Sequence, residues 1–116
     1  MQVIVKDHNK KIKINLKKTG LFTRGSGLMF RTKNTDNLLF EFGKDVRISI
    51  TSFFVFFPFL AIWLDKNNNV VDKKIVKPFI LSIKPRNKFR KIIEVPLREN
   101  TEDIIKFFLG KGERFK

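Results

Sequence analysis

The sequence contains no cysteine and no tyrosine, and its single histidine is His8. The absence of cysteine excludes disulfide bonds, thiolate metal sites and a cysteine nucleophile. No serine lies in a G-x-S-x-G context, no glycine-rich segment ends in G-K-[ST], and the carboxylates lack the spacing of metal ligands. Because catalysis requires positioned titratable side chains, we predict no catalytic residue, no metal site and no cofactor. An enzyme whose site depends on residues without a recognisable motif stays open as an alternative to a non-catalytic protein.

Acidic residues are scarce as well, since 25 Lys and Arg stand against 11 Asp and Glu, a formal net charge of +14. Such an excess attracts nucleic acids, other polyanions and anionic membranes. A general compositional bias explains it equally well, because Lys, Asn, Ile and Phe are abundant whereas alanine occurs once. If the charge is functional, the candidate polyanion contacts are the densest basic cluster beyond the N-terminus: Lys84, Arg86, Lys88, Arg90 and Lys91.

The longest apolar segment is the uncharged run of 17 residues from 48 to 64. A membrane-spanning helix needs about 20 predominantly apolar residues, so we predict no membrane span. The β-branched and aromatic residues of the run favour strands, and Pro58 predicts a bend between two of them. All residues from 53 to 57 are apolar, whereas a half-buried strand alternates. Either protein covers both faces of this segment, or an apolar patch is exposed.

The remaining segments indicate a mainly β chain. Ile12, Ile14 and Leu16 alternate with lysines, which predicts a strand with one buried face. The full set of predicted strands is 2–6, 11–17, 38–42 ending at Gly43, one from Val46, 70–76, 79–83 and 89–95, with a polar hairpin loop at 7–10 and a turn at 65–69. Asn100 as N-cap, followed by the apolar Ile104, Phe107 and Phe108, predicts a helix. We therefore expect a small single-domain β-barrel or sandwich-like fold, residues 1–116, with one short C-terminal α-helix.

Several motifs follow one another in a specific order: GLMFR at 27–31, LLFEF at 38–42, ITSFFVFFPFLAIWLDKNNNVV at 50–71, KPF at 77–79 and KIIEVPL at 91–97. Their order and spacing resemble family 192 of the domains of unknown function over residues 19–115, with residues 1–18 forming an N-terminal hairpin. The resemblance implies a small β-rich, barrel-like domain with little helix. It implies no activity, because the family has no established biochemical function.

The chain differs from the family pattern within its apolar segment. Phe56 and Leu60 stand where similar proteins carry an arginine and an aspartate. Replacing both members of a buried ion pair with apolar residues is often neutral, so the change can serve folding alone. Alternatively, Phe54, Phe56 and Leu60 form an apolar patch for an apolar ligand or for a second copy of the chain.

A second difference concerns Thr51 and Ser52, which stand where similar proteins carry histidine and threonine. Together with Arg31 of GLMFR and Lys77 of KPF, they are the candidate pocket or motif residues. The GLMFR motif itself has a simpler explanation, in which a glycine turn precedes core-facing Leu28 and Phe30.

These observations predict a non-catalytic binding or structural accessory domain with an apolar ligand or self-association surface. The alternative is a basic protein that binds nucleic acid or another polyanion. The corresponding partners are a second copy of the chain in a homodimer, or a weakly bound nucleic acid. No apolar stretch follows the first charges as in a signal peptide, so we expect a soluble cytoplasmic protein.

Overall fold

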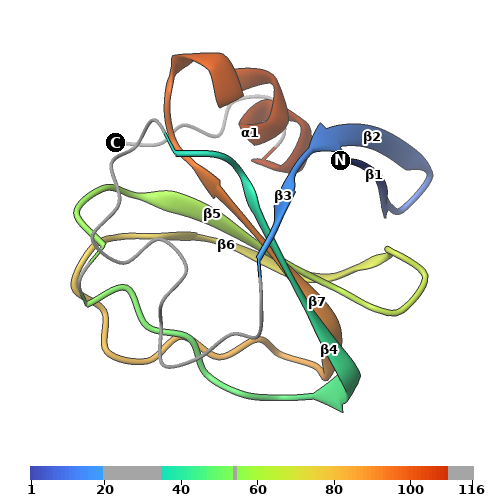
Figure 1. Cartoon of the computed structure of the whole chain (residues 1–116), viewed down its shortest axis with the longest axis horizontal. Helices are drawn as coiled ribbons and strands as arrows, with labels where there is room; N and C mark the ends of the chain where they lie inside the picture. Colours follow the sequence, from blue (N-terminus) through green and yellow to red (C-terminus); the bar gives the residue numbers. More distant parts are fainter. Residues whose placement is uncertain (20–34, 54, 110–116) are drawn as a thin grey trace.

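The computed structural model describes residues 1–19, 35–53 and 55–109. Within these residues the strands are β1 (Gln2–Asp7), β2 (Lys10–Asn15), β3 (Lys17–Lys18), β4 (Leu38–Val46), β5 (Phe59–Leu64), β6 (Val70–Val76) and β7 (Phe89–Pro96). A short 3₁₀-helix, η1 (Glu99–Thr101), leads directly into the helix α1 (Glu102–Leu109) (Figure 1). The predicted mainly β fold with a short C-terminal helix is confirmed.

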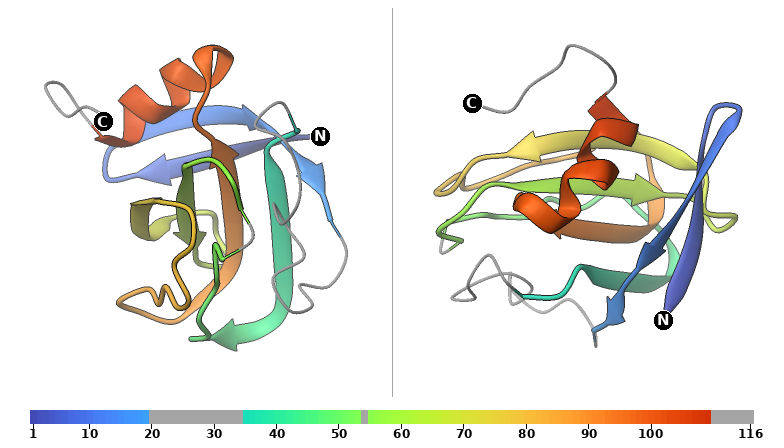
Figure 2. Two further views of the ribbon diagram at one scale, coloured as in Figure 1. Left: turned by 90° about the vertical axis from the view of Figure 1, so that its left-hand side faces the viewer. Right: turned by 90° about the horizontal axis from the view of Figure 1, so that it is seen from above.

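The strands form a two-stranded sheet, β1-β2, and a five-stranded sheet in the order β3-β4-β7-β5-β6. Strand β7 pairs antiparallel with both β4 and β5, β6 pairs antiparallel with β5, and β3 pairs parallel with β4. The hairpin β1-β2 and α1 lie on the same side of the larger sheet (Figure 2). The described strands do not close into a barrel, and the sandwich-like form of the prediction fits this arrangement.

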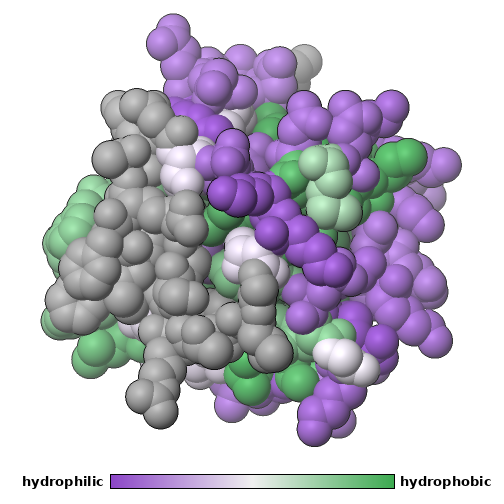
Figure 3. Space-filling view, viewed as in Figure 1, coloured by the Kyte–Doolittle hydropathy of each residue, from purple (hydrophilic) through white to green (hydrophobic). Residues whose placement is uncertain are grey.

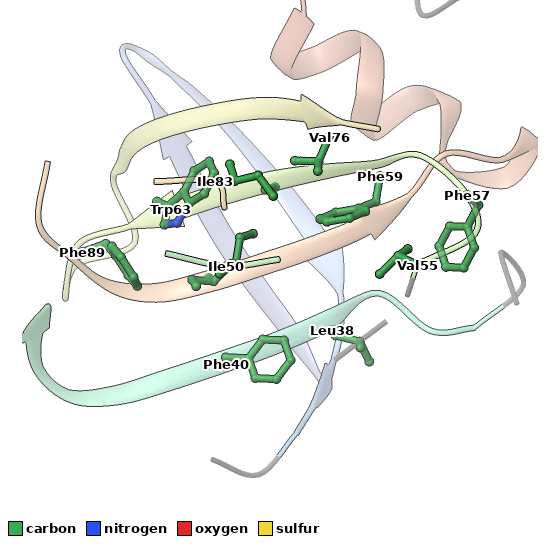
Figure 4. Close-up of a cluster of buried hydrophobic side chains, with 12 residues drawn as sticks. Leu38, Phe40, Ile50, Val55, Phe57, Phe59, Trp63, Val76, Ile83 and Phe89 are labelled. Carbon is green, nitrogen blue, oxygen red and sulfur yellow. The ribbon is translucent and has the colours of Figure 1, made fainter. Parts of the chain in front are cut away.

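The larger sheet is buried on both faces. The loop-side cluster contains Leu38, Phe40, Ile50, Val55, Phe57, Phe59, Ala61, Trp63, Val76, Ile83, Phe89 and Ile92 (Figure 4). The hairpin-side cluster contains Val5, Ile14, Leu16, Leu39, Leu60, Ile62, Leu64, Ile93, Val95 and Phe108. All residues of β5 are buried, because successive side chains alternate between two covered faces. The second part of the apolar run, Phe59–Leu64, is therefore an inner strand of the sheet, between β7 and β6.

The N-terminal hairpin agrees with the prediction. Its register pairs Gln2 with Asn15 and Asp7 with Lys10, and His8 in the turn has a φ of 57°. Ile14 is fully buried, whereas the lysines that alternate with it are exposed. The buried face of the hairpin therefore packs on the sheet, as the alternation in the sequence predicts.

The predicted turn at 65–69 is also confirmed. The Oδ1 atom of Asp65 accepts hydrogen bonds from the backbone N–H groups of Asn67, at 2.8 Å, and Asn69, at 2.9 Å. Asn68 adopts a left-handed φ of 65°, which asparagine tolerates better than most residues. The turn also supports the hairpin, because the carbonyl oxygen of Asn68 accepts a hydrogen bond of 2.9 Å from Lys6 N–H.

Two predicted strands are absent from the described residues. Residues 53 and 55–57 form no strand, and residues 79–83 are irregular apart from one bridge between Ile83 and Ile50. The prediction of a strand before Pro58 was therefore wrong, as was that of a strand at 79–83. The reason is that residues 79–83 bond to residues 50–52 through a few backbone contacts and a side-chain hydroxyl rather than through a regular ladder, while the N–H of Val55 bonds locally to the carbonyl oxygen of Ser52.

The strand predicted to end at Gly43 instead continues to Val46 as part of β4. Its register with β7 shifts between Glu41, opposite Lys91, and Val46, opposite Phe89. The additional residues on β4 are accommodated as an irregularity of the ladder, so the polar Lys44 and Asp45 do not separate two strands.

The helix begins differently from the prediction, because Asn100 lies inside η1 and is not its N-cap. A capping box joins Arg98 and Thr101, and the Thr101 Oγ1 accepts a hydrogen bond of 3.1 Å from Arg98 N–H. Phe108 is the buried residue of α1 and belongs to the hairpin-side cluster. Among the described residues, no helix is long and apolar enough to cross a membrane.

We expect Phe108→Ala to lower the free energy of unfolding by roughly 3 kcal/mol, because it removes a large buried side chain and leaves a cavity. Urea denaturation followed by Trp63 fluorescence measures this loss. The control is Lys106→Ala on the exposed side of α1, which removes only an ion pair with Glu102 and should cost less than about 0.5 kcal/mol. Equal effects of the two substitutions would contradict the packing of α1 described here.

Candidate functional site

The most distinctive feature of the surface is a group of exposed apolar side chains on two neighbouring loops. We call it the apolar loop surface; its members and exposed fractions are Phe53 (40%), Phe56 (57%), Phe79 (56%), Ile80 (41%) and Leu81 (73%). Figure 3 shows hydrophobic side chains along the left-hand edge, next to the loops drawn at the left of Figure 1. Exposed apolar groups gathered in this way are typical of an interaction site.

Phe79 connects the aromatic rings of this surface. Its ring centroid lies 5.7 Å from that of Phe56, at an interplanar angle of 62°, and 6.4 Å from that of Phe53, at 81°. Edge-to-face pairs of this kind are favourable. The three rings therefore form one contiguous aromatic group, although Phe79 is far from the other two in the sequence.

Ser52 holds the two loops together from beneath. It is fully buried, and its hydroxyl donates a hydrogen bond of 2.6 Å to the carbonyl oxygen of Lys77 and accepts one of 2.9 Å from Ile80 N–H. Its backbone N–H donates to the Ile80 carbonyl at 2.9 Å, and its carbonyl oxygen accepts from Phe79 N–H at 2.8 Å. This network fixes the backbone on which the apolar loop surface stands.

Three of the predicted motif residues thus converge, but through backbone contacts. Thr51 donates a hydrogen bond of 3.0 Å to the Ile80 carbonyl, next to the bonds of Ser52. Lys77 contributes its carbonyl oxygen to Ser52, while its own side chain is exposed. Thr51 and Ser52 therefore connect the two loops through hydrogen bonds.

Phe79 has a left-handed backbone, with a φ of 66°. This conformation costs a non-glycine residue about 1 kcal/mol or more, and such strain is concentrated at functional sites. The hydrogen bonds to Ser52 on either side of the Phe79 side chain hold it in this conformation. The sequence alone does not reveal this residue, because phenylalanine does not ordinarily signal a positive φ.

The predicted apolar patch of Phe54, Phe56 and Leu60 needs correction. Leu60 is fully buried in the hairpin-side cluster, because it lies on the face of β5 opposite to the loops. Phe56 is exposed, so Phe56 and Leu60 do not line one cavity. Phe54 and Arg31 lie outside the described residues. Of the three patch residues, Phe56 belongs to the apolar loop surface.

The predicted polyanion contacts include residues that bond within the chain. Arg86 approaches the buried Asp72 at 3.3 Å, and its backbone N–H donates to the same carboxylate at 2.9 Å. Arg90 forms an ion pair of 3.1 Å with Asp45. Both arginines therefore contribute to the tertiary structure, and their charges are partly balanced.

The lysines of the same segment differ among themselves. The Nζ of Lys91 donates a hydrogen bond of 2.7 Å to the Asn68 side chain. Lys84 and Lys88 have exposed side chains, and the Lys84 carbonyl oxygen accepts a hydrogen bond of 3.0 Å from the Lys74 Nζ. Lys84 and Lys88 are thus the members of the predicted cluster most open to a partner.

Glu94 is a buried acid that sequence analysis missed. It lies on β7 between Leu38 and Ala61 of the adjacent strands, which belong to the loop-side cluster, and it is 3% exposed. Its Oε1 atom is buried without a hydrogen-bond partner among the described residues. Burial raises the pKa of Glu94 to about 8, so the carboxyl is protonated at neutral pH. The only signal in the sequence is one acid within an apolar strand.

A hollow of about 720 Å³ lies where the hairpin, β3 and η1 meet. Its lining includes Lys17, Lys18, Asn37 and Arg98. Asn37 donates a hydrogen bond of 3.2 Å to the Asn15 carbonyl, while its Oδ1 is buried without a partner among the described residues. Burial lowers the pKa of Arg98. This hollow is open, and its lining combines several basic side chains with one carboxylate, Asp36, whose charge acts on Arg98.

Metal-ligating side chains do not cluster among the described residues. These residues contain no group of three or more His, Cys, Asp or Glu side chains that could hold a metal ion. His8 is in the hairpin turn, where its side chain is 93% exposed and lies 3.7 Å from Asp7.

The sequence of the chain matches DUF192 (Uncharacterized ACR, COG1430) over residues 2–106. The chain belongs to this family. The match includes the N-terminal hairpin, so DUF192 extends further toward the N-terminus than the motifs alone indicate. No curated protein matches the chain.

Two solved structures are similar to this DUF192 chain. A Sinorhizobium meliloti protein named as a candidate transcription regulator aligns with a TM-score of 0.69 and 14% identity, over 87% of this chain and 81% of that one. A protein of unknown function from Novosphingobium aromaticivorans aligns with a TM-score of 0.65 and 15% identity, over 89% and 76%. At these identities the similarity establishes the fold alone.

We expect Ser52→Ala to lower the free energy of unfolding by about 1–3 kcal/mol, because it removes the two partly buried hydrogen bonds that the buried hydroxyl forms with backbone groups of Lys77 and Ile80. The amide of Ile80, which donates to the Ser52 hydroxyl, should also exchange faster with deuterium. The matched control is Ser49→Ala at an exposed position on the same chain segment, where stability should change by less than about 0.5 kcal/mol. An Ile80 exchange rate unchanged by Ser52→Ala would show that the hydroxyl does not hold the loops.

The protonated Glu94 predicts a particular dependence of stability on pH. Between its ordinary pKa of 4.5 and its folded value of about 8, the folded chain retains a proton that the unfolded chain releases. The contribution of Glu94 to the free energy of unfolding is therefore fully present below about pH 4.5. It decreases as the pH rises to about 8, by an amount on the order of 5 kcal/mol.

Glu94→Gln should remove this contribution to the pH dependence. We expect the stability difference between the variant and the natural chain, measured by urea denaturation at several pH values, to shift in favour of the variant as the pH rises. A difference independent of pH from about 5 to 8 would mean that Glu94 is not protonated in the folded state.

Proposed function

We propose that this DUF192 protein is a non-catalytic binding domain and that its contact surface is the apolar loop surface. The proposal depends on one observation above all: Phe53, Phe56 and Phe79 are exposed together on loops that buried hydrogen bonds hold in place. A preorganised surface loses less conformational entropy when a partner binds, so more of the free energy from apolar contact contributes to the affinity.

The identity of the exposed residues supports this proposal further. Fully burying a phenylalanine or leucine side chain contributes roughly 1.5–3 kcal/mol. The five side chains of the apolar loop surface can therefore contribute to the binding of a partner through area that folding leaves exposed. The left-handed φ of Phe79 also supports the proposal, because strained backbone conformations are concentrated at functional sites.

The alternative function, binding of nucleic acid or another polyanion, has weaker support in the residues. Arg86 and Arg90 of the basic cluster form ion pairs with Asp72 and Asp45. Nucleic-acid binders that hold single strands alternate basic groups with stacking aromatics, and this cluster contains one aromatic residue, Phe89, which is buried.

The test uses the uncharged apolar dye Nile red and the double variant Phe56→Ser, Leu81→Ser. We expect the natural chain to bind the dye and the variant to bind it at least about fivefold more weakly, since roughly 1 kcal/mol of apolar contact is removed. Both side chains are more than half exposed, so the variant should unfold at nearly the same urea concentration.

The matched control is Ile4→Ser, which removes an exposed apolar side chain from β1, away from the two loops; Ile4 is 49% exposed. Dye binding should not change in this control. If the double variant and the control bind Nile red equally, the apolar loop surface is not a binding surface. Sedimentation of the natural chain shows in parallel whether a second copy occupies it.

A further inference from the structure

We infer that the apolar loop surface docks on an anionic lipid bilayer, with its side chains inserted into the interface and no part of the chain spanning it. This inference rests on the proposed function and specifies the partner. The two loops supply the exposed apolar side chains, and the residues around them supply positive charge. Interfacial binding requires both, since apolar insertion and attraction to anionic lipids act together.

The distribution of charge is the first argument. The two segments that contain the loops, residues 46–64 and 73–93, have no Asp or Glu, although the chain has 11 such residues elsewhere. Residues 73–93 contain eight basic residues. Three of them form ion pairs with carboxylates outside the segment, Lys73 with Asp7, Arg86 with Asp72 and Arg90 with Asp45. The other five are Lys74, Lys77, Lys84, Lys88 and Lys91. No carboxylate within these segments would therefore be forced against a negatively charged membrane.

The positions of the nearest basic residues are the second argument. Lys77 and Lys84 are exposed, and they flank the segment with Phe79, Ile80 and Leu81 on either side. The side chain of Lys74 is also held close to this segment, because its Nζ donates to the Lys84 carbonyl at 3.0 Å. Basic residues beside an apolar centre match the order of a membrane interface, where phosphates lie outside the acyl chains.

Arg47 adds a further cation from the other segment. Its Nε donates a hydrogen bond of 3.1 Å to the carbonyl oxygen of Pro85. This bond connects the Arg47 side chain, which precedes the loop with Phe53 and Phe56, to the residues that follow the loop with Phe79, Ile80 and Leu81. The bridge between Ile50 and Ile83 lies next to this contact. The two loops and the basic residues next to them are therefore held in a fixed arrangement relative to one another.

Two other partners fit less well. A second copy of the chain would bring the same lysine-flanked surfaces together in a pair of molecules that each have a net charge of +14, which electrostatic repulsion opposes. Nucleic acid would match the charge, but Leu81 and Ile80 have no ring on which a base can stack. Only the lipid interface uses the aliphatic and the basic side chains at once.

The experiment is co-sedimentation of the full chain with vesicles of phosphatidylcholine alone, or of phosphatidylcholine with phosphatidylserine. We expect at least about tenfold tighter binding to the anionic vesicles, and a decrease in binding as salt is added. The variant Phe56→Ser, Leu81→Ser should bind at least about tenfold more weakly, because it removes the inserted side chains.

A pair of charge variants separates local from general attraction. Lys77→Gln, Lys84→Gln removes two charges next to the apolar loop surface, whereas Lys10→Gln, Lys11→Gln removes two exposed charges from the hairpin turn. Binding to anionic vesicles should fall about tenfold or more in the first variant and about twofold or less in the second. Equal losses would overturn the inference, because they indicate adsorption by net charge alone.

The remaining outcomes also decide the question. If anionic vesicles do not bind the natural chain while Nile red still does, the proposed binding surface stands and the lipid partner is wrong. If Phe56→Ser, Leu81→Ser dissociates a dimer in sedimentation, a second copy is the occupant. If the same substitutions instead weaken binding to single-stranded DNA and leave vesicle binding unchanged, the partner is a nucleic acid.

Discussion

The burial of strand β5 on both faces is the constraint on which the rest of the structure depends. One face of the sheet is covered by the hairpin and α1, and the other by loops that contribute Ile50, Val55, Phe57 and Ile83. Loops that cover a sheet must direct some apolar side chains inward, and the intervening residues then face solvent. The exposure of Phe53 and Phe56 beside the buried Val55 and Phe57 is the result of this geometry. The apolar loop surface is thus coupled to the core.

The fold could be predicted from the sequence where apolar and polar residues alternate. Ile14 and its neighbours alternate with lysines, and the hairpin was correctly predicted; Asp65 and the asparagines after it specified a turn. Residues 53–57 carry no such period, because they are all apolar. No sequence pattern distinguishes a strand from a loop at these residues. The loop conformation depends on contacts with residues 79–83, which are distant in the sequence. The register shift in β4 is likewise a property of its pairing with β7.

The candidate site was predicted only in part, for a related reason. Thr51, Ser52 and Lys77 attracted attention through their positions in the family pattern, and the structure brings them together. Phe79, Ile80 and Leu81 were missed because a short apolar segment reads as a buried strand. The left-handed backbone of Phe79 arises from hydrogen bonds to a residue more than twenty positions earlier, and local propensity contains no information about a contact at that distance.

The anchoring by Ser52 has a consequence for how freely this region can change. Its hydroxyl and its peptide group bond to backbone atoms of Lys77, Phe79 and Ile80, and none of these bonds requires a particular side chain on the partner. Positions 56 and 81 can therefore be varied while the scaffold beneath them is preserved. A fixed backbone support beneath contact residues that can change allows a small domain to acquire new binding preferences, by evolution or in a combinatorial library, without a change of fold.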